Sequence, residues 1–202
     1  MKTNPNSKSA MRKLIVISFL TLDGVMQAPG GKEEDTSGGF KYGGWQQPFF
    51  GDNTVSEELG KMGALLIGRK TYDIFASYWP TEGKSIETFG PFMNNITKYV
   101  ASRTLKETNW QNSILLKDDV AEAVAGVKEE AGKDIYMFGS GDLCQTLMRH
   151  NLIDEYLLMI HPLALGNGKQ LFQQGGPKQD FKLLKSKITQ NGILVLTYKV
   201  KN

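Results

Sequence analysis

The sequence predicts an α/β domain with a mostly parallel sheet that ends in an antiparallel hairpin. Short runs of β-branched and large apolar residues alternate with amphipathic helical segments along most of the chain, which is typical of parallel βαβ units. Near the C-terminus, strand-like segments at 181–189 and 193–200 are joined through Asn191-Gly192. This dipeptide is the strongest short-range signal for a tight hairpin.

The strands before the hairpin are short and are bounded by glycine, proline or polar residues. They are expected at 13–20, 64–67, 98–101, 113–116, 134–138 and 155–160. The first run is apolar almost throughout, which favours a central strand covered on both faces.

Helices are expected between these strands. The segment 54–62 begins with the Thr-x-x-Glu spacing of a capping box and places Val55, Leu59 and Met62 on one helical face. Further helices are expected at 71–77, at 119–131 and directly after Gly141.

A long glycine-rich segment, at about 21–50, separates the first strand from the first helix. Loops of this length inside a compact domain are usually functional or disordered. The acidic cluster Glu33-Glu34-Asp35 within it is expected to be solvated.

The length, composition and net charge limit the kind of protein that this chain can form. The 202 residues, 40% of them hydrophobic, suffice for one domain, which we place at 12–202 behind a disordered polar tail at 1–11. The net charge of +3 comes without a dense basic block, and the longest apolar run is too short to span a bilayer, so neither nucleic acid nor membrane is expected as a partner. One cysteine and two histidines supply neither a disulfide nor a zinc site, which favours a cytoplasmic protein without a metal.

Three strand ends carry groups that suit a phosphorylated cofactor, and the first follows the strand at 64–67. Gly68 permits a close approach of the backbone to a ligand. Arg69 and Lys70 supply two cations, and Thr71 opens a helix whose N–H groups attract phosphate oxygens. Taken alone, this segment fits an ordinary glycine turn with solvated basic residues equally well.

The other two strand ends have the same character. Ser102 and Arg103 offer the hydroxyl and guanidinium donors that a 2′-phosphate needs. The turn Gly139-Ser140-Gly141-Asp142 exposes backbone amides to a pyrophosphate, although Cys144 stands where the full dinucleotide fingerprint has its last glycine. Because ligands of open α/β sheets bind at the carboxyl ends of the strands, the three segments together predict a dinucleotide site.

These segments resemble the dihydrofolate-reductase-like superfamily. Residues 67–72, Ile-Gly-Arg-Lys-Thr-Tyr, are similar to its Gly-Arg-x-Thr-aromatic segment, and residues 138–141 are similar to its glycine-rich turn. Residues 22–26 and 161–168 resemble two loops of the reductase domain of the bifunctional riboflavin-biosynthesis deaminase-reductase. The resemblance covers the chain from about residue 12 to 200, and the zinc-binding cysteines of the deaminase half are not in the sequence.

The resemblance implies a three-layer αβα sandwich, often a homodimer, with NADPH lying across the strand ends. Arg69, Lys70, Ser102 and Arg103 would then lie near the adenosine end and the 2′-phosphate. Thr71 and the 139–142 turn would hold the pyrophosphate. Asp23 and Gly24 would lie beside the nicotinamide and the substrate.

Hydride transfer to a C=N or C=O bond requires a proton donor, for which the sequence offers two candidates. Asp52 lies close to the acidic position of the folate reductases, but it also fits a helix N-terminal charge. Asp23 lies in a substrate loop of the family, but it also fits an Asp-Gly turn. Trp45 and Phe49 suit either stacking on a flat heterocycle or packing, and His161 is expected to be structural.

The leading hypothesis is an NADPH-dependent reductase similar to the one that acts on the ribosylaminopyrimidine intermediate of riboflavin synthesis. A basic pocket able to hold a substrate phosphate would favour it. One alternative is a folate or pteridine reductase, which a buried carboxylate at Asp52 would favour. The other is a nucleotide-binding module without turnover.

Overall fold

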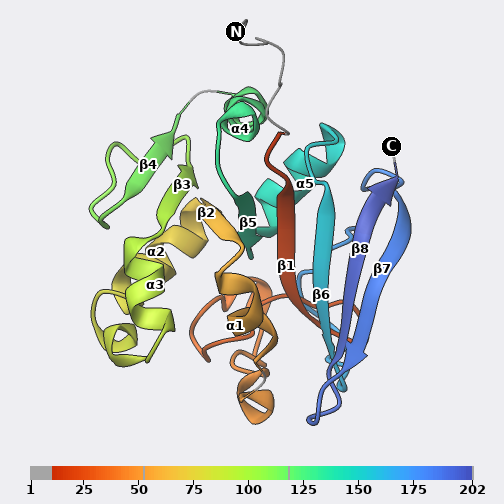
Figure 1. The fold of residues 1–202 in the computed structure, drawn as a ribbon. Helices are drawn as coiled ribbons and strands as arrows, with labels where there is room; N and C mark the ends of the chain where they lie inside the picture. Colours follow the sequence, from red (N-terminus) through yellow and green to blue (C-terminus); the bar gives the residue numbers. More distant parts are fainter. Residues whose placement is uncertain (1–10, 52, 118, 202) are drawn as a thin grey trace, which may run out of the picture.

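An eight-stranded mixed sheet with helices on both faces forms the centre of the protein (Figure 1). The computed structural model describes residues 11–51, 53–117 and 119–201. The strands are β1 (Leu14–Thr21), β2 (Met62–Gly68), β3 (Thr97–Ala101), β4 (Ser113–Leu116), β5 (Asp134–Phe138), β6 (Glu155–His161), β7 (Asp180–Ile188) and β8 (Leu194–Lys201). The helices are α1 (Thr54–Leu59), α2 (Arg69–Tyr78), α3 (Phe89–Asn95), α4 (Val120–Glu129) and α5 (Gly141–Arg149).

The strand order is β4-β3-β2-β5-β1-β6-β8-β7, and the first six of these strands run parallel. β8 is antiparallel to β6, and β7 is antiparallel to β8. The predicted mixture of a mostly parallel sheet with an antiparallel C-terminal hairpin is therefore confirmed.

The core consists of two apolar layers that share the sheet. Leu14 and Val16 of β1 face the layer that contains the buried side of α4 and α5. Ile15 and Ile17 face the layer that contains Leu59, Tyr72 and Met93, one residue from each of α1, α2 and α3. β1 is thus covered on both faces, as its apolar sequence predicts.

The first helix differs from the prediction in both of its ends. The N-cap residue is Asn53 and Thr54 is the first helical residue, so Thr54 does not occupy the N-cap position that the predicted capping box requires. Met62 was expected on the helix but begins β2, because the helix ends at Leu59 and the chain turns at Gly60.

The structure also contains helical elements that the sequence did not predict. α3 and the single 3-10 turns at 37–39, 47–49 and 82–85 were not predicted. The tail predicted at 1–11 lies, apart from Met11, outside the described residues.

Candidate functional site

The predicted cofactor segments directly follow parallel strands, whose carboxyl ends lie along one border of the sheet. We call this border the strand edge. β2 runs into α2 at Gly68, and β5 runs into α5 through the 139–141 turn. β3 lies beside β2 and leads to Ser102, whereas β1 lies beside β5 and leads to Asp23. The fold therefore brings these segments to one edge, where the sequence places a ligand.

Ser140 joins the segments that follow β2 and β5. Its Oγ accepts a hydrogen bond from the Gly68 backbone N–H (2.7 Å) and lies 2.9 Å from the Thr71 Oγ1. A Cβ atom at Gly68 would lie 3.0 Å from that Oγ, and one at Gly139 would lie 3.3 Å from the Thr71 hydroxyl. The two glycines therefore let the starts of α2 and α5 approach closely.

The backbone that enters α5 is left-handed at two successive residues, Gly139 (φ 56°) and Ser140 (φ 63°). For serine this conformation costs about 1–2 kcal/mol, which the hydrogen bonds of its side chain offset. The first N–H groups of a helix have no partner within that helix, so α2 and α5 both direct amide donors toward this edge. Asp142 lies in the first turn of α5, and its negative charge opposes the binding of an anion there. An anion at this helix start would therefore be attracted by the backbone N–H groups alone.

The basic side chains at this edge are on the surface. Arg69 Nε donates to both carboxylate oxygens of Asp73 at 2.8 Å, in an exposed pair one helical turn apart. Such pairs are worth little, so phosphate can displace Asp73 at small cost. Lys70 and Arg103 are exposed. The Ser102 Oγ accepts from two backbone N–H groups of its own turn and so shapes the end of β3.

Asp23 ties the end of β1 to the 163–168 segment. Its carboxylate accepts hydrogen bonds from the Thr21 hydroxyl (2.5 Å) and from the backbone N–H groups of Leu165 (3.1 Å) and Gly166 (2.7 Å). These bonds, the one from Thr21 foremost, lower the pKa of Asp23 below its usual 3.8. The carboxylate is an ionised acceptor at neutral pH, which opposes a role as proton donor. Gly24, at φ 80°, turns the chain behind it.

The glycine-rich segment 21–50 is ordered by the segment that follows β6. The Gln27 Oε1 accepts from the backbone N–H of Lys169 (3.0 Å), while its Nε2 donates to the carbonyls of Asp35 and Ser37 (3.0 Å each). This one side chain holds both segments in register. The two segments together form a wall beside the strand ends.

The acidic cluster in this wall is not solvated throughout, and that prediction is wrong for two of its residues. The half-buried Glu34 carboxylate accepts from the backbone N–H of Gly30 (2.6 Å), and its burial raises its pKa. Asp35 pairs with the Lys169 ammonium (2.5 Å). Burial opposes ionisation of Asp35, but hydrogen bonds from Lys169 and Ser37 outweigh it and lower its pKa to about 2.

Three aromatic rings surround His161 at the end of β6. The ring centroids of Trp45, Phe49 and Phe19 lie 5.2, 5.3 and 6.2 Å from that of His161, all edge to face. The Trp45 indole N–H donates to the Gln27 carbonyl (2.7 Å), and the ring is buried. The His161 Nδ1 lies within 3.2 Å of two backbone carbonyls, so the imidazole acts as a structural donor, as expected.

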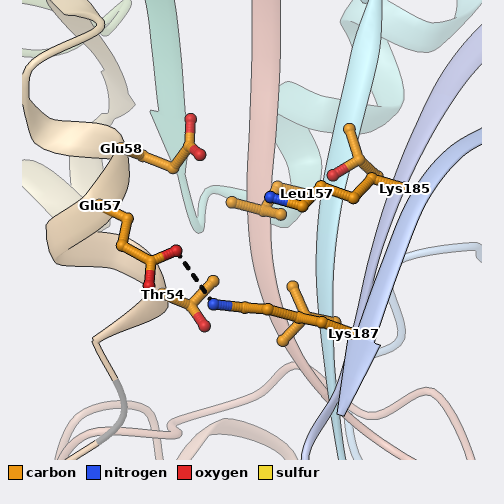
Figure 2. A pocket seen from close by; sticks show the side chains of 8 residues that line it. Thr54, Glu57, Glu58, Leu157, Lys185 and Lys187 are labelled. Atoms are coloured by element: carbon orange, nitrogen blue, oxygen red, sulfur yellow. Dashed lines mark hydrogen bonds and ion pairs between the residues drawn. The ribbon is translucent and has the colours of Figure 1, made fainter. Parts of the chain in front are cut away.

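Asp52, the first candidate proton donor, lies outside the described residues. Two glutamates further along, on α1, border a small hollow of about 20 Å³ that is open to solvent (Figure 2). Glu57 pairs with Lys187 of β7 across the hollow (3.0 Å), as the dashed line in Figure 2 shows. The Tyr136 hydroxyl donates to Glu58 (3.0 Å), and burial foremost raises the pKa of Tyr136.

The sequence does not predict this hollow. Leu157 and Val195 also line it, and Lys185 and Lys187 border it from β7 (Figure 2). The only sequence signal was the alternation of lysines along β7, which puts them on one face of a strand. Whether this face of β7 lies toward α1 depends on the strand register, which cannot be read from the sequence. None of the residues predicted for the cofactor lines the hollow.

Two general features complete the site. Among the described residues, no three His, Cys, Asp or Glu side chains are grouped so that they would hold a metal ion. Within the same residues, every helix is too short or too polar to cross a membrane.

A mixed sheet of this order, with helices on both faces and two helix starts meeting at the carboxyl ends of β2 and β5, defines a three-layer α/β protein. Within this class, the chain belongs to the RibD C-terminal domain family, whose sequence model matches residues 12–195.

Two relatives come from Bacillus subtilis (strain 168). The uncharacterized protein YyaP is 28% identical over 191 residues, which cover 93% of this chain and 94% of YyaP. The uncharacterized protein YwjB is 23% identical over 165 residues, which cover 81% of this chain and 84% of YwjB.

Solved structures share the fold over nearly the whole chain. A putative riboflavin biosynthesis protein from Shewanella sp. PV-4 superposes with a TM-score of 0.69 at 21% identity, covering 94% of this chain and 99% of that one. A pyrimidine reductase-like protein from Corynebacterium diphtheriae gives 0.62 at 14% identity, covering 98% and 96%. Acinetobacter baumannii RibD gives 0.61 at 14% identity, and here 96% of this chain covers 59% of the RibD chain.

Proposed function

We propose that the protein is an NADPH-dependent reductase of a small heterocyclic substrate, similar to the 5-amino-6-(5-phosphoribosylamino)uracil reductase of riboflavin biosynthesis. The observation that carries the proposal is the junction at Ser140, which sets the N-termini of α2 and α5 side by side at the strand edge. Membership of the RibD C-terminal domain family supports the oxidoreductase class. The proposal includes a cytoplasmic homodimer.

The strand edge fits a dinucleotide phosphate. Ser140 turns its hydroxyl toward Gly68 and Thr71, so this hydroxyl does not occupy the backbone amides of Gly139 and Gly141. These amides and the first turns of both helices would bind the pyrophosphate. Lys70 and Arg103, with Arg69 once it leaves Asp73, would bind the 2′-phosphate. Bound there, NADPH supplies a hydride.

The predicted catalytic and substrate-binding residues are assigned proposed roles from their positions. Asp23 is proposed as a positioning group, because its ionised carboxylate fixes Leu165 and Gly166 beside the strand ends. Trp45 and Phe49 are proposed to border the substrate, and Asp52 remains the proposed proton donor.

The charges around the hollow of Figure 2 balance, because two glutamates and two lysines border it: Glu57, Glu58, Lys185 and Lys187. It is therefore not the basic pocket that would favour a phosphorylated substrate over a pterin.

A second candidate is a nucleotide-binding protein without turnover. The lowered pKa of Asp23 favours it, because an ionised carboxylate opposes a role as proton donor. The two candidates share the cofactor site and differ only in catalysis.

The first experiment is a titration with NADPH and with NADH, followed by tryptophan fluorescence, on the wild type, Arg69→Ala and the control Arg149→Ala. Arg149 lies at the opposite end of α5, so its loss leaves the strand edge unchanged. We expect the wild type and the control to prefer NADPH by at least about tenfold, and Arg69→Ala to lose that preference. Failure of both nucleotides to bind at millimolar concentration would remove the reductase proposal. Consumption of NADPH with pyrimidine and pterin substrates then separates a reductase from a binding module.

A further inference from the structure

At three places in the chain an aspartate or asparagine directly precedes a glycine: residues 23–24, 167–168 and 191–192. At such a pair the backbone nitrogen of the glycine can attack the side-chain carbonyl carbon of the residue before it. A side chain on the following residue would hinder this attack, and glycine has none. Which of the three pairs reacts depends on how the fold holds the two reacting groups.

The first pair is held at both reacting groups. The Asp23 carboxylate accepts hydrogen bonds from the backbone N–H groups of Leu165 and Gly166. The Gly24 backbone N–H, which would supply the attacking nitrogen, donates to the Thr21 carbonyl (2.9 Å). Because an ionised carboxylate is also a poor electrophile, this pair is protected from the reaction.

The pair in the turn of the β7–β8 hairpin is held in the same way. The Asn191 Nδ2 donates to the carbonyls of Phe49 and Phe50 (3.3 and 3.5 Å). The Gly192 backbone N–H donates to the Thr189 carbonyl (3.0 Å). Ring closure at this pair must first break these three hydrogen bonds.

The remaining pair, Asn167 and Gly168, has no such bonds. Among the residues that the structure describes, neither the Asn167 side chain nor the Gly168 backbone N–H forms a hydrogen bond with another residue. Asn167 is exposed, and a Cβ atom at Gly166 would meet nothing within 4 Å. The backbone before Asn167 therefore has room for the rotation that ring closure requires.

We propose that Asn167 is a site of spontaneous deamidation, at which the side-chain amide is lost and the backbone beside the strand edge is altered. The Gly168 nitrogen loses its proton and forms a bond to the Asn167 Cγ, while the bond from Cγ to Nδ2 breaks. The Nδ2 amino group takes up a proton and leaves as ammonia. Water then opens the cyclic imide at either carbonyl, which gives aspartate or isoaspartate.

The reaction loosens the wall that 21–50 forms with the segment after β6. Isoaspartate lengthens the backbone by one carbon atom, two residues before the Lys169 N–H that donates to Gln27 (3.0 Å). A Cβ atom at Gly168 would lie 2.6 Å from the Val25 Cγ1, so there is no space at that residue to take up the added length. The segment after β6 therefore moves, and its hydrogen bond to Gln27 weakens.

Peptide mapping by mass spectrometry tests the site, because trypsin separates the two Asn-Gly pairs. Cleavage after lysine and arginine puts Asn167 on the peptide 150–169 and Asn191 on the peptide 188–199. In native protein kept at mildly alkaline pH, we expect Asn167 to convert at least about tenfold faster than Asn191, whose hydrogen bonds must break first. In urea, where neither pair is held, the two rates should be similar.

Hydrogen exchange of 21–50 tests the effect on the wall. The matched control is Asn167→Gln, which keeps an exposed amide but would have to close a larger and less favourable ring. We expect exchange in 21–50 to become faster as the wild type ages and to stay constant in the control kept under the same conditions.

Equal rates at Asn167 and Asn191 in the native protein would overturn the proposed site. The same holds if Asn167 converts in urea but not in the native protein. An aged wild type in which 21–50 exchanges as slowly as before would overturn the effect on the wall. NADPH titration of fresh protein tests the proposed function separately, since deamidation requires only water and does not depend on a cofactor.

Discussion

At the scale of single residues, the site depends on side chains that satisfy backbone groups of distant segments. Ser140 holds a left-handed conformation while its hydroxyl contacts Gly68 and Thr71. The sequence predicted that these segments lie at one edge, because strand ends of a parallel sheet must. It did not predict the hydrogen bonds between them, since these depend on rotamers and on positive φ angles that no local pattern specifies.

The two functions of Ser140 can be separated by substitution. Ser140→Ala removes the hydrogen bonds and keeps the left-handed strain, so we expect the free energy of unfolding to fall by about 1–2 kcal/mol. Ser140→Gly removes the same bonds but relieves about 1 kcal/mol of strain, so it should be the more stable of the two. Urea unfolding measures both, and a glycine variant less stable than the alanine variant would contradict this account.

Asp23 illustrates the limit of residue-level prediction. Its place in an Asp-Gly turn was visible in the sequence, but two of its partners, Leu165 and Gly166, lie more than 140 residues away. Those partners help to lower the pKa of Asp23, but the hydrogen bond from Thr21, two residues away, contributes most. The position of the carboxylate beside Leu165 and Gly166, rather than its ionisation, therefore depended on contacts that only the fold supplies.

At the scale of elements, α3 shows why a helix can escape prediction. Its sequence places Gly90 and Pro91 in the first turn, and neither residue is a helix signal. Its last carbonyls, at Met93 and Asn94, accept from the Lys98 ammonium at 2.9 and 3.1 Å. A side chain of β3 thus satisfies the C-terminal carbonyls of this helix, which no pattern within the helix predicts. The strands, in contrast, were predicted closely, because each is a local apolar run.

Lys98 makes the stability of this arrangement depend on pH. The side chain is fully buried, and burial lowers its pKa to about 8 from 10.5. Between these values the unfolded chain binds a proton that the folded chain does not, so folding becomes more favourable as the pH rises.

We expect the stability of the wild type, relative to Lys98→Met, to rise by up to about 3 kcal/mol between about pH 7 and about pH 10.5. Urea unfolding across this range measures the difference. The exposed Lys84→Met serves as the control and should show a flat difference. A flat difference for Lys98→Met as well would show that Lys98 is not desolvated.

The wall formed by 21–50 and the segment after β6 depends on a close backbone approach. A Cβ atom at Gly168 (φ 129°) would lie 2.6 Å from the Val25 Cγ1 and 2.9 Å from the Phe40 ring. Gly166 (φ 77°) has open space around it. The sequence showed a glycine-rich loop in both places but not which glycine bears the contact.

Comparison of Gly168→Ala with Gly166→Ala tests this close approach, because both substitutions place alanine at positive φ but only Gly168 has atoms in contact distance of the new Cβ. The φ of 129° at Gly168 also lies farther from the left-handed region than the φ of 77° at Gly166, so backbone strain adds to the loss at Gly168. We expect Gly168→Ala to lower the free energy of unfolding by about 1–3 kcal/mol more than Gly166→Ala, since only the former overpacks the core. Thermal unfolding of both variants measures the difference. Equal losses would contradict a close approach at Gly168.

At the scale of the whole molecule, the two core layers share one sheet, and this argues for a single cooperative unit. β1 contributes side chains to both layers, so loss of either layer exposes the central strand. Such sharing of the sheet is expected of a single domain over 12–202. Strand alternation predicted this organisation, while the faces of the C-terminal hairpin needed the register.

Cys144 reports on that cooperativity, because it is fully buried in the layer of α4 and α5 and its burial raises its pKa to about 12. Its thiol should react with a disulfide reagent near pH 8 only when the whole domain opens, at least roughly a thousandfold more slowly than an exposed thiol. The control is the double variant Cys144→Ala, Arg149→Cys, which moves the thiol to an exposed position of the same helix. If the reaction of Cys144 follows global unfolding measured in urea, the two layers unfold together. A fast reaction well below the unfolding transition would mean that the α4–α5 layer opens on its own, and the chain would then not be one cooperative domain.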